Sequence, residues 1–355
     1  MALLSFQIII IFWLLKYVCL YDSYSGDISP YVKTRVNNID SRVQVVSNHD
    51  AAERTKSAYL GASFKKLPQH CLKVQCSYTC FNGRQKEIVS DIQYAISISN
   101  HSESCDVIDE LRLYNYEFIN ATVGIGFLST FGDKVKDIYI AISNVTAIEN
   151  GAFGEGIFNK IILEDLRLKD ITNGIFRNIS EDLKGIYITQ REEPVQCIYP
   201  SFLDSVKFQI EHLVIRVGLE CVRNVTAHDP VMGLLAFVDF SYNNFSSQLL
   251  EDTFSKLTMV ERFVLSNSNI MYLPQYIFQG MEYLEYLDIS HNKLKTISSS
   301  IFGSRTIAQN VRIIANDNVW HCDCTLQYEM NTIFCIIKTT NVLLVSRGFQ
   351  ELLGI

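Results

Sequence analysis

The sequence has no excess of basic residues, because its 31 lysines and arginines are outnumbered by 38 aspartates and glutamates, for a formal net charge of -7. Binding to a nucleic-acid backbone needs a basic surface, and no basic cluster offsets this negative charge. The GxSxG, HExxH, phosphate-loop and GxGxxG patterns of common enzymes are also missing. The scattered histidines show no metal-ligand spacing. These absences argue against nucleic-acid binding, catalysis, a cofactor and a resident metal ion.

After its first residues the sequence lacks any apolar run of membrane-spanning length. Residues 1–15 are strongly apolar and end before Lys16. They are shorter than the roughly 20 residues that a spanning helix needs. We therefore expect residues 1–25 to be a secretory signal peptide, with an uncleaved membrane anchor as the alternative. Residues 26–66 are polar and without a repeat, which predicts a flexible leader on a secreted, extracellular chain.

A repeat of 24 residues occupies positions 260–305. Val260, Phe263 and Leu265 in the first block recur as apolar residues 24 positions later in the second. The alternation of apolar residues has a period of two, which predicts a short strand with one face turned inward. One such coil cannot bury its apolar side alone, so neighbouring coils must stack and their strands must pair in parallel. An Asn after the strand, here Asn292, can bond otherwise unpaired backbone in the following turn.

The spacing LxxLxLxx(N/S)xLxxLxxxxF resembles that of the extracellular leucine-rich repeat family. The resemblance implies an α/β solenoid, a horseshoe with a concave parallel β-sheet and an irregular or short-helical convex side. We assign about eight repeats to residues 107–306, with drifting spacing in the first half. The third repeat is placed at Leu163, Leu166 and Leu168, which predicts a strand around Arg167.

Four cysteines precede the first repeat, namely Cys71, Cys76, Cys80 and Cys105. A secreted chain meets an oxidising compartment and the end of a solenoid needs a cover, so we expect two disulfides here. Four cysteines allow three pairings and the spacing selects none of them, while zinc binding is the alternative. The resemblance implies that residues 67–106 form an N-terminal cysteine cap.

Two more cysteines lie about one repeat apart, in the fourth and fifth coils. Stacking of these coils would bring Cys197 and Cys221 close together on the outer wall. We expect a disulfide between them, with two buried free thiols as the alternative.

The segment NVWHCDCTL at residues 318–326 resembles the opening of the family's C-terminal cap. The resemblance implies that residues 307–355 form this cap and that Trp320 closes the end of the core. The family's cap supplies two later partners for Cys322 and Cys324, but only Cys335 follows here. One cysteine then stays free or links two chains, or the sequence ends within the cap. A metal site at His321 with the adjacent cysteines is a further alternative.

Six N-x-S/T sequons predict N-linked glycosylation in a secreted chain. They lie at Asn100, Asn120, Asn144, Asn178, Asn224 and Asn244. All five sequons within the repeats follow a predicted strand and none lies on one. Glycans at these positions would coat the loops and the outer wall and leave the concave sheet open.

The concave sheet is therefore the candidate binding surface. Strands roughly 4.8 Å apart make a face about 40 Å long, which is large enough for a protein ligand. Its side chains are basic and aromatic in the first half and acidic toward the end, and Tyr and Arg are common anchors of protein interfaces. The candidate residues are Arg112, Tyr139, Arg167, Tyr187, Phe237, Asp239, Tyr242, Arg262, Tyr286, Asp288 and His291. The alternative is that these positions are solvated and bind nothing.

The resemblance implies a recognition module without enzymatic activity, since fold alone licenses no chemistry. We expect a secreted glycoprotein that binds a protein or glycan on its concave face, in innate immunity or cell adhesion. The alternative is the ectodomain of a signalling or adhesion receptor whose membrane segment is not part of this sequence.

Overall fold

The computed structural model describes eleven stretches of the chain, all within the compact unit of residues 65–355. These are residues 71–98, 105–128, 134–154, 156–172, 174–195, 198, 202–219, 233–246, 249–303, 311–320 and 342–345. The predicted signal peptide and leader lie outside them. In the described part, every helix falls short of the length and apolar character that crossing a membrane requires.

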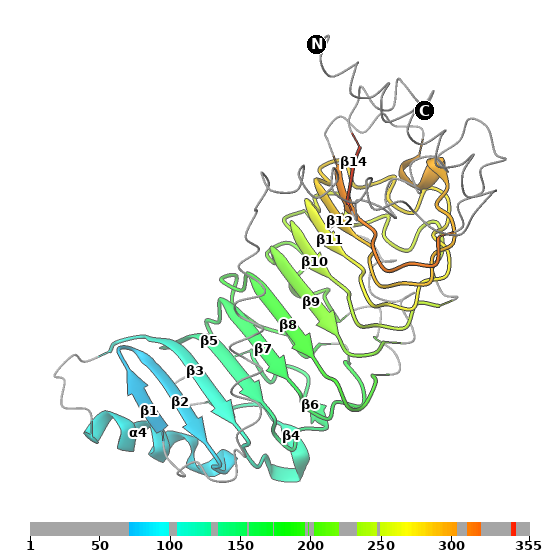
Figure 1. The fold of residues 1–355 in the computed structure, drawn as a ribbon. Helices are drawn as coiled ribbons and strands as arrows, with labels where there is room; N and C mark the ends of the chain where they lie inside the picture. The colour runs from blue at the N-terminus through cyan, green and yellow to red at the C-terminus, as the bar shows by residue number, and fades with distance from the viewer. Residues whose placement is uncertain are drawn as a thin grey trace, which may run out of the picture. The chain divides into compact units, whose positions relative to one another are not determined.

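A single twelve-stranded sheet organises the described residues, and its strands follow one another in chain order (Figure 1). The strands are β1 (Cys71–Val74), β2 (Ser77–Phe81), β3 (Ile108–Tyr114), β5 (Val135–Ala141), β7 (Lys160–Glu164), β8 (Gly185–Thr189), β9 (His212–Arg216), β10 (Phe237–Asp239), β11 (Arg262–Val264), β12 (Tyr286–Asp288), β13 (Val311–Ile314) and β14 (Val342–Val345). Pairing from β2 through β13 is parallel throughout. The stacked-coil solenoid expected from the repeat is confirmed.

The register of the sheet follows the apolar pattern that defines the repeat. Phe263 on β11 lies opposite Leu287 on β12, and both side chains are fully buried. Each strand therefore places the same repeat position beside its neighbour. Stacking of equivalent apolar residues builds one continuous core from coil to coil.

The third repeat lies earlier in the sequence than we predicted. Ile161 and Leu163 on β7 pair with Ile138 and Ile140 on β5, so the strand ends at Glu164. The prediction of a strand around Arg167 is therefore wrong. Both KIILE and LRL satisfy the apolar alternation, but only the first keeps the register of the preceding coil.

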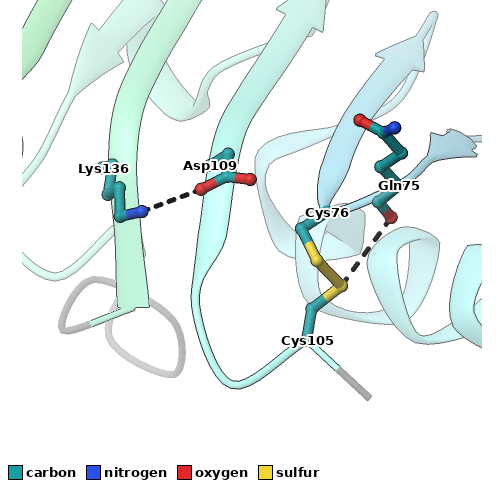
Figure 2. Close-up of a disulfide and its surroundings, with 5 residues drawn as sticks. All are labelled: Gln75, Cys76, Cys105, Asp109 and Lys136. Carbon is teal, nitrogen blue, oxygen red and sulfur yellow. Dashed lines mark hydrogen bonds and ion pairs between the residues drawn. A yellow bond between two sulfur atoms is a disulfide. The ribbon is translucent and has the colours of Figure 1, made fainter. Parts of the chain in front are cut away.

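The N-terminal end of the sheet is a hairpin joined to a helix. β1 and β2 pair in antiparallel fashion, and α4 (Ile88–Ile98) packs against both through buried Ile88 and Ile92. Disulfides join Cys71 to Cys80 across the hairpin and Cys76 to Cys105 at the approach to β3 (Figure 2). The expected pair of disulfides is present, and the structure selects one of the three pairings.

Short elements connect the strands on the other side of the core. They are η3 (Gln85–Glu87), η4 (Ile119–Ala121), β4 (Thr122–Val123), β6 (Ala147–Ile148) and η6 (Ser299–Phe302). β4 and β6 form a separate two-stranded parallel sheet. These segments match the predicted irregular and short-helical side of the solenoid.

Phenylalanine rings form two spines through the core behind the sheet. In the first half, the Phe153 ring lies 6.1 Å from that of Phe176, which lies 6.5 Å from Phe202. In the second half, Phe254 stacks on Phe278 at 6.4 Å, and Phe278 contacts Phe302 at 5.7 Å. One ring per coil thus fills the space between the sheet and the outer wall. Offset and edge-on ring pairs of this kind add to the hydrophobic contribution.

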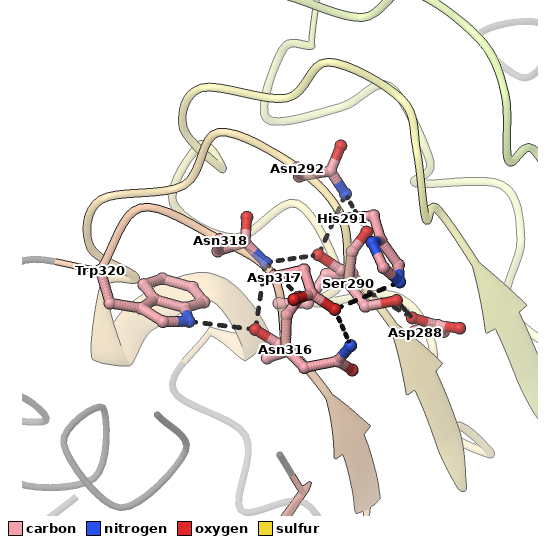
Figure 3. Close-up of polar contacts among 10 residues, drawn as sticks. Asp288, Ser290, His291, Asn292, Asn316, Asp317, Asn318 and Trp320 are labelled. Atoms are coloured by element: carbon pink, nitrogen blue, oxygen red, sulfur yellow. Dashed lines mark hydrogen bonds and ion pairs between the residues drawn. The ribbon is translucent and has the colours of Figure 1, made fainter. Parts of the chain in front are cut away.

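Buried amides bond the backbone at the turns that follow the strands. The Asn292 Oδ1 atom accepts hydrogen bonds from the backbone N–H groups of Ser268 and Ile270, and its Nδ2 atom donates to the carbonyls of Leu265 and Ile289. Asn318 occupies the equivalent place one coil later (Figure 3). The role predicted for Asn292 is confirmed.

Candidate functional site

The face of the sheet turned away from the core, which we call the open face, receives three residues from each of the strands β3 to β9 and two from each of β10 to β13. They form three columns because parallel strands in register place equivalent residues side by side. The first column contains Glu110, Asp137, Lys160, Gly185, His212, Phe237, Arg262, Tyr286 and Arg312. The middle column contains Arg112, Tyr139, Ile162, Tyr187, Val214, Asp239, Val264, Asp288 and Ile314. The last column contains Tyr114, Ala141, Glu164, Thr189 and Arg216.

Half-buried aromatic side chains dominate the first half of this face. The Phe81 ring on β2 stacks on Tyr114 at 5.5 Å, and Tyr114 contacts Tyr139 at 5.3 Å. Burial raises the pKa of the Tyr114 and Tyr187 phenols above the ordinary value. These rings lie against the sheet and still present part of their surface to solvent. They offer apolar contact area at a low cost in conformational entropy.

Charged side chains on the open face are arranged as ion pairs. The Arg112 guanidinium donates to the Glu110 carboxylate at 2.7 Å, and this bond is the main reason that the pKa of Arg112 is raised. The Lys160 ammonium lies 3.3 Å from the Asp137 carboxylate on the neighbouring strand. Burial outweighs this attraction, so the pKa of Asp137 is raised above its usual value.

Two aspartates of the middle column are occupied by bonds within the chain. Asp239 is only 2% exposed, accepts hydrogen bonds from the backbone and hydroxyl of Ser241, and pairs with Arg216. Asp288 accepts the same two bonds from Ser290, at 2.9 and 2.6 Å (Figure 3). These carboxylates therefore shape the strand ends; an arginine compensates Asp239, whereas Asp288 is held by Ser290.

In the second half of the face, planar and cationic groups stack in the first column. The His212 ring contacts the Phe237 ring at 5.7 Å, and the Arg262 guanidinium lies over the Tyr286 ring at 5.0 Å. A guanidinium above an aromatic face is held by the quadrupole of the ring. Arg262 thus lies along the sheet and covers part of Tyr286.

The structure places the eleven predicted site residues in three settings. Arg112, Tyr139, Tyr187, Phe237, Asp239, Arg262, Tyr286 and Asp288 lie in the columns of the open face. Tyr242 and His291 follow β10 and β12 in the left-handed region, at φ of 58° and 53°, and lie in the turns. Arg167 lies past the end of β7, where its backbone N–H donates to the Val145 carbonyl.

Sequence reasoning missed the outer columns in the first half of the face. Phe81, Tyr114 and Lys160 contribute there, although none was singled out. The signal was available, because residues two positions before and after each middle-column residue share its face. Phe81 was missed for another reason: β2 belongs to the cap and has no repeat pattern of its own.

A hollow of about 560 Å³ opens at the N-terminal edge of the sheet, where the strands begin. Its lining alternates in charge, with Asp109, Lys136, Asp137, Asn159, Lys160, Asp182 and Lys184. The Lys136 ammonium lies 2.9 Å from the Asp109 carboxylate, close to the Cys76–Cys105 disulfide (Figure 2). Lys160 pairs with Asp137 inside the hollow, whereas Lys184 pairs with Glu211 outside its lining. Over the described stretches, no group of three His, Cys, Asp or Glu side chains is placed to hold a metal ion.

Four of the predicted glycosylation sites lie in described residues, and all four lie outside the strands of the large sheet. Asn120 is part of η4, while Asn144 and Asn244 follow β5 and β10 in the turns, and Asn178 lies in a turn at φ 62°. Asn100 and Asn224 fall outside the described residues. So do Cys197, Cys221, Cys322, Cys324 and Cys335, together with His321.

Two family models match segments of this chain. One, for the leucine-rich repeat, covers residues 258–305, and the other, for the BspA type leucine-rich repeat region, covers residues 128–222. The chain is a leucine-rich repeat protein. This agrees with the parallel solenoid and with the family resemblance of the repeat spacing. The two matches lie on either side of residues 223–257, and β10 continues the leucine-rich repeat sheet between them.

Curated relatives share part of their length with this leucine-rich repeat protein. Leucine-rich repeat-containing protein 3B of Danio rerio is 33% identical over 88 residues, which are 24% of this chain and 33% of that protein. Tsukushi of Mus musculus is 30% identical over 103 residues, or 29% of this chain and 28% of that protein. The chain thus spans about a third of the curated relatives that it matches.

Two solved structures match part of this chain. Human 5T4, the trophoblast glycoprotein, is 14% identical with a TM-score of 0.43, over 79% of this chain and 89% of that one. A chain of the Drosophila Toll–Spatzle complex is 17% identical with a TM-score of 0.43, over 64% of this chain and 32% of that one.

Proposed function

We propose that this leucine-rich repeat protein is a secreted, glycosylated recognition module that binds a protein partner on its open face. The observation that carries this proposal is the set of partly exposed Tyr, Phe and Arg side chains on successive strands of one sheet. Such side chains supply most of the binding energy in protein interfaces. We assign no bond-making role to the residues of this face.

The positions of the described sequons support the same surface. Asn120, Asn144, Asn178 and Asn244 all lie off the large sheet. Glycans attached there would leave the open face accessible while making the remaining surface hydrophilic. The alternative, a membrane receptor ectodomain, uses the same face and differs only in how the chain is retained at the cell.

One substitution can place a glycan in the middle of the open face. Val264→Asn creates the sequon N-L-S with Leu265 and Ser266, in the middle column of β11. The chain, secreted from cultured animal cells, would first be screened against purified ectodomains and arrayed glycans. We expect Val264→Asn to abolish binding of the selected ectodomain, because the glycan covers the interface.

The matched control keeps the substitution and removes the sequon. The double variant Val264→Asn/Ser266→Ala is not glycosylated at that position and should bind nearly as well as the unmodified chain. Equal binding by the glycosylated variant would show that the open face is not the interface. Selection of glycans only, with no ectodomain, would replace the protein partner by a carbohydrate one.

A further inference from the structure

The apolar groups of the open face form one continuous line that changes column as it crosses the sheet. It begins in the last column, where the Phe81 and Tyr114 rings stack at 5.5 Å. From Tyr114 it passes to Tyr139 in the middle column at 5.3 Å. Ile162 on β7 is the register partner of Tyr139 and continues the line toward β8. We call this line, with its continuation to β12, the aromatic track.

The aromatic track moves to the first column at Gly185. The Tyr187 ring leans over this glycine, so closely that a Cβ atom at position 185 would lie 2.7 Å from its Cε2 atom. Gly185 is the register partner of His212, whose ring contacts Phe237 at 5.7 Å. The track then follows the first column to Tyr286 on β12, where the guanidinium of Arg262 from β11 lies over the Tyr286 ring at 5.0 Å.

The glycine at position 185 is explained by the Tyr187 ring and not by the backbone. Gly185 is absent from the described glycines with positive φ, so any residue can adopt its strand conformation. Valine or threonine would suit a strand better. A side chain at position 185 would occupy the space that the Tyr187 ring now fills. The crossing of the track from one column to the next therefore depends on this position.

Three carboxylates beside the track are compensated within the chain. Glu110 is paired with Arg112, and Asp137 with Lys160, in the first half, while Asp239 is paired with Arg216 in the second. A partner of strong net charge would have to compete with these ion pairs. A partner that is uncharged along the track would displace water from the rings without separating any ion pair.

Resting on the proposed function, we infer that the aromatic track binds an extended segment of a partner protein with apolar or aromatic side chains and no net charge. The segment lies obliquely across the strands from β2 to β12. These nine strands, about 4.8 Å apart, span roughly 38 Å, which an extended segment of about 12 residues at roughly 3.3 Å each would match. The ion pairs on either side of the track exclude charged side chains from the segment.

A library of random 15-residue peptides displayed on yeast tests this inference against the secreted, full-length chain. The probes then measured are the selected peptides, and each is compared with a copy in which its aromatic residues are replaced by glutamate. We expect selection of uncharged peptides with two or more aromatic or large aliphatic residues. We expect glutamate copies to bind at least ten-fold more weakly.

Two variants separate the arrangement of the track from its composition. Tyr187→Ala removes a ring, whereas Gly185→Val keeps every ring and fills the space that the Tyr187 ring occupies. Both variants should bind the selected peptides at least ten-fold more weakly. Tyr272→Ala is the control, because Tyr272 is exposed and lies outside the strands. Circular dichroism of each variant checks that the fold is retained.

The outcomes distinguish failure of the track from failure of the proposed function. If the Val264→Asn glycan blocks peptide binding but Tyr187→Ala and Gly185→Val leave it unchanged, the track is not the binding site and the open face remains the interface. Peptides indifferent to all three variants overturn both. A selection dominated by acidic or basic peptides, or one that enriches no peptide, also overturns the track.

Discussion

At the scale of single residues, the buried amides in the turns each form hydrogen bonds with several backbone groups. Asn292 is buried and holds two N–H groups and several carbonyls of adjacent coils. The serine at the same place one coil earlier, Ser268, only donates, to the carbonyls of Phe240 and Ser266. Removing the amide therefore leaves more buried backbone groups without a hydrogen-bond partner than removing the hydroxyl does.

We expect Asn292→Ala to lower the free energy of unfolding by about 2–4 kcal/mol, because two buried N–H groups lose their acceptor. Ser268→Ala should cost about 1 kcal/mol. Its two carbonyl partners keep other donors, since Asn243 Nδ2 donates to the Phe240 carbonyl and the Tyr242 N–H donates to that of Ser266. Urea unfolding of both variants, with exposed Lys293→Ala as the control, measures the difference. Equal losses for Asn292→Ala and Ser268→Ala would contradict this account of the turn.

Asp137 gives a pH dependence whose sign follows from its environment. Burial raises the pKa of its carboxyl, although the Lys160 ammonium partly opposes the rise. A folded-state pKa above the unfolded value means that ionisation disfavours the folded chain. Stability from this group is therefore highest below the ordinary Asp pKa of about 3.9 and falls as pH rises through the folded value.

We expect Asp137→Asn to unfold at higher urea concentration than the unmodified chain at pH 7, with the difference shrinking toward pH 4. In a Lys160→Met background the gain from Asp137→Asn at pH 7 should be larger, because Asp137 there lacks its compensating charge. Urea midpoints at a series of pH values provide the measurement. A variant less stable than the unmodified chain at pH 7 would mean that the ion pair outweighs burial.

At the scale of elements, the coils of the two spines are held between the sheet and a stacked phenylalanine. Phe176 is fully buried and contacts the rings of both neighbouring coils, Phe153 and Phe202. Phe208, a few residues further on, is 63% exposed. The two phenylalanines thus differ strongly in burial.

We expect Phe176→Ala to lower the free energy of unfolding by about 3–5 kcal/mol, through lost burial and the cavity left between two rings. Phe208→Ala should change it by less than about 0.5 kcal/mol. Denaturant unfolding monitored by circular dichroism compares them. A comparable loss for the two variants would place the spine outside the core.

At the scale of the whole molecule, stability is a chain of neighbour contacts. The Cys76–Cys105 disulfide ties the cap hairpin to the approach of β3, and the cap covers one end of the sheet. In stacked repeats a local change spreads only as far as the coupling between adjacent coils. Loss of this disulfide should therefore be felt first at β2 and β3.

We expect the paired variant Cys76→Ser/Cys105→Ser to accelerate amide hydrogen exchange in β2 and β3 and to leave β11 and β12 almost unchanged. Mass spectrometry of peptides from each strand measures the gradient. Uniform acceleration along the sheet would show that the solenoid unfolds as one unit. The unmodified chain under the same buffer is the reference.

Much of this architecture could be predicted from the spacing of apolar residues, and the predictions that failed did so for physical reasons. Phe263 and Leu287 were placed correctly because one register satisfies both the period of two and the period of 24. Arg167 was misplaced because two apolar pairs lie within eight residues, and only contact with Ile138 and Ile140 decides between them. Neighbouring coils carry that information, and a single repeat does not.

The amide that holds the turn of the third coil shows the same limit. Gln190 bonds the backbone N–H and carbonyl of Leu168 from the following coil, and it lies one residue before the repeat position of Asn292. Its longer side chain compensates for the shift, which no spacing rule anticipates. The columns of the open face were half predictable, since the middle column follows from the repeat and Phe81 belongs to a cap without one.

The strand direction reverses at both ends of the described sheet. β1 runs antiparallel to β2, and β14 runs antiparallel to β13, whereas every strand between them is parallel. A stack of identical parallel coils has no built-in stopping point, and a second molecule could add its own first coil to the last. The reversed strands β1 and β14 break this parallel repeat, so each end of the described sheet finishes with an element other than a further coil.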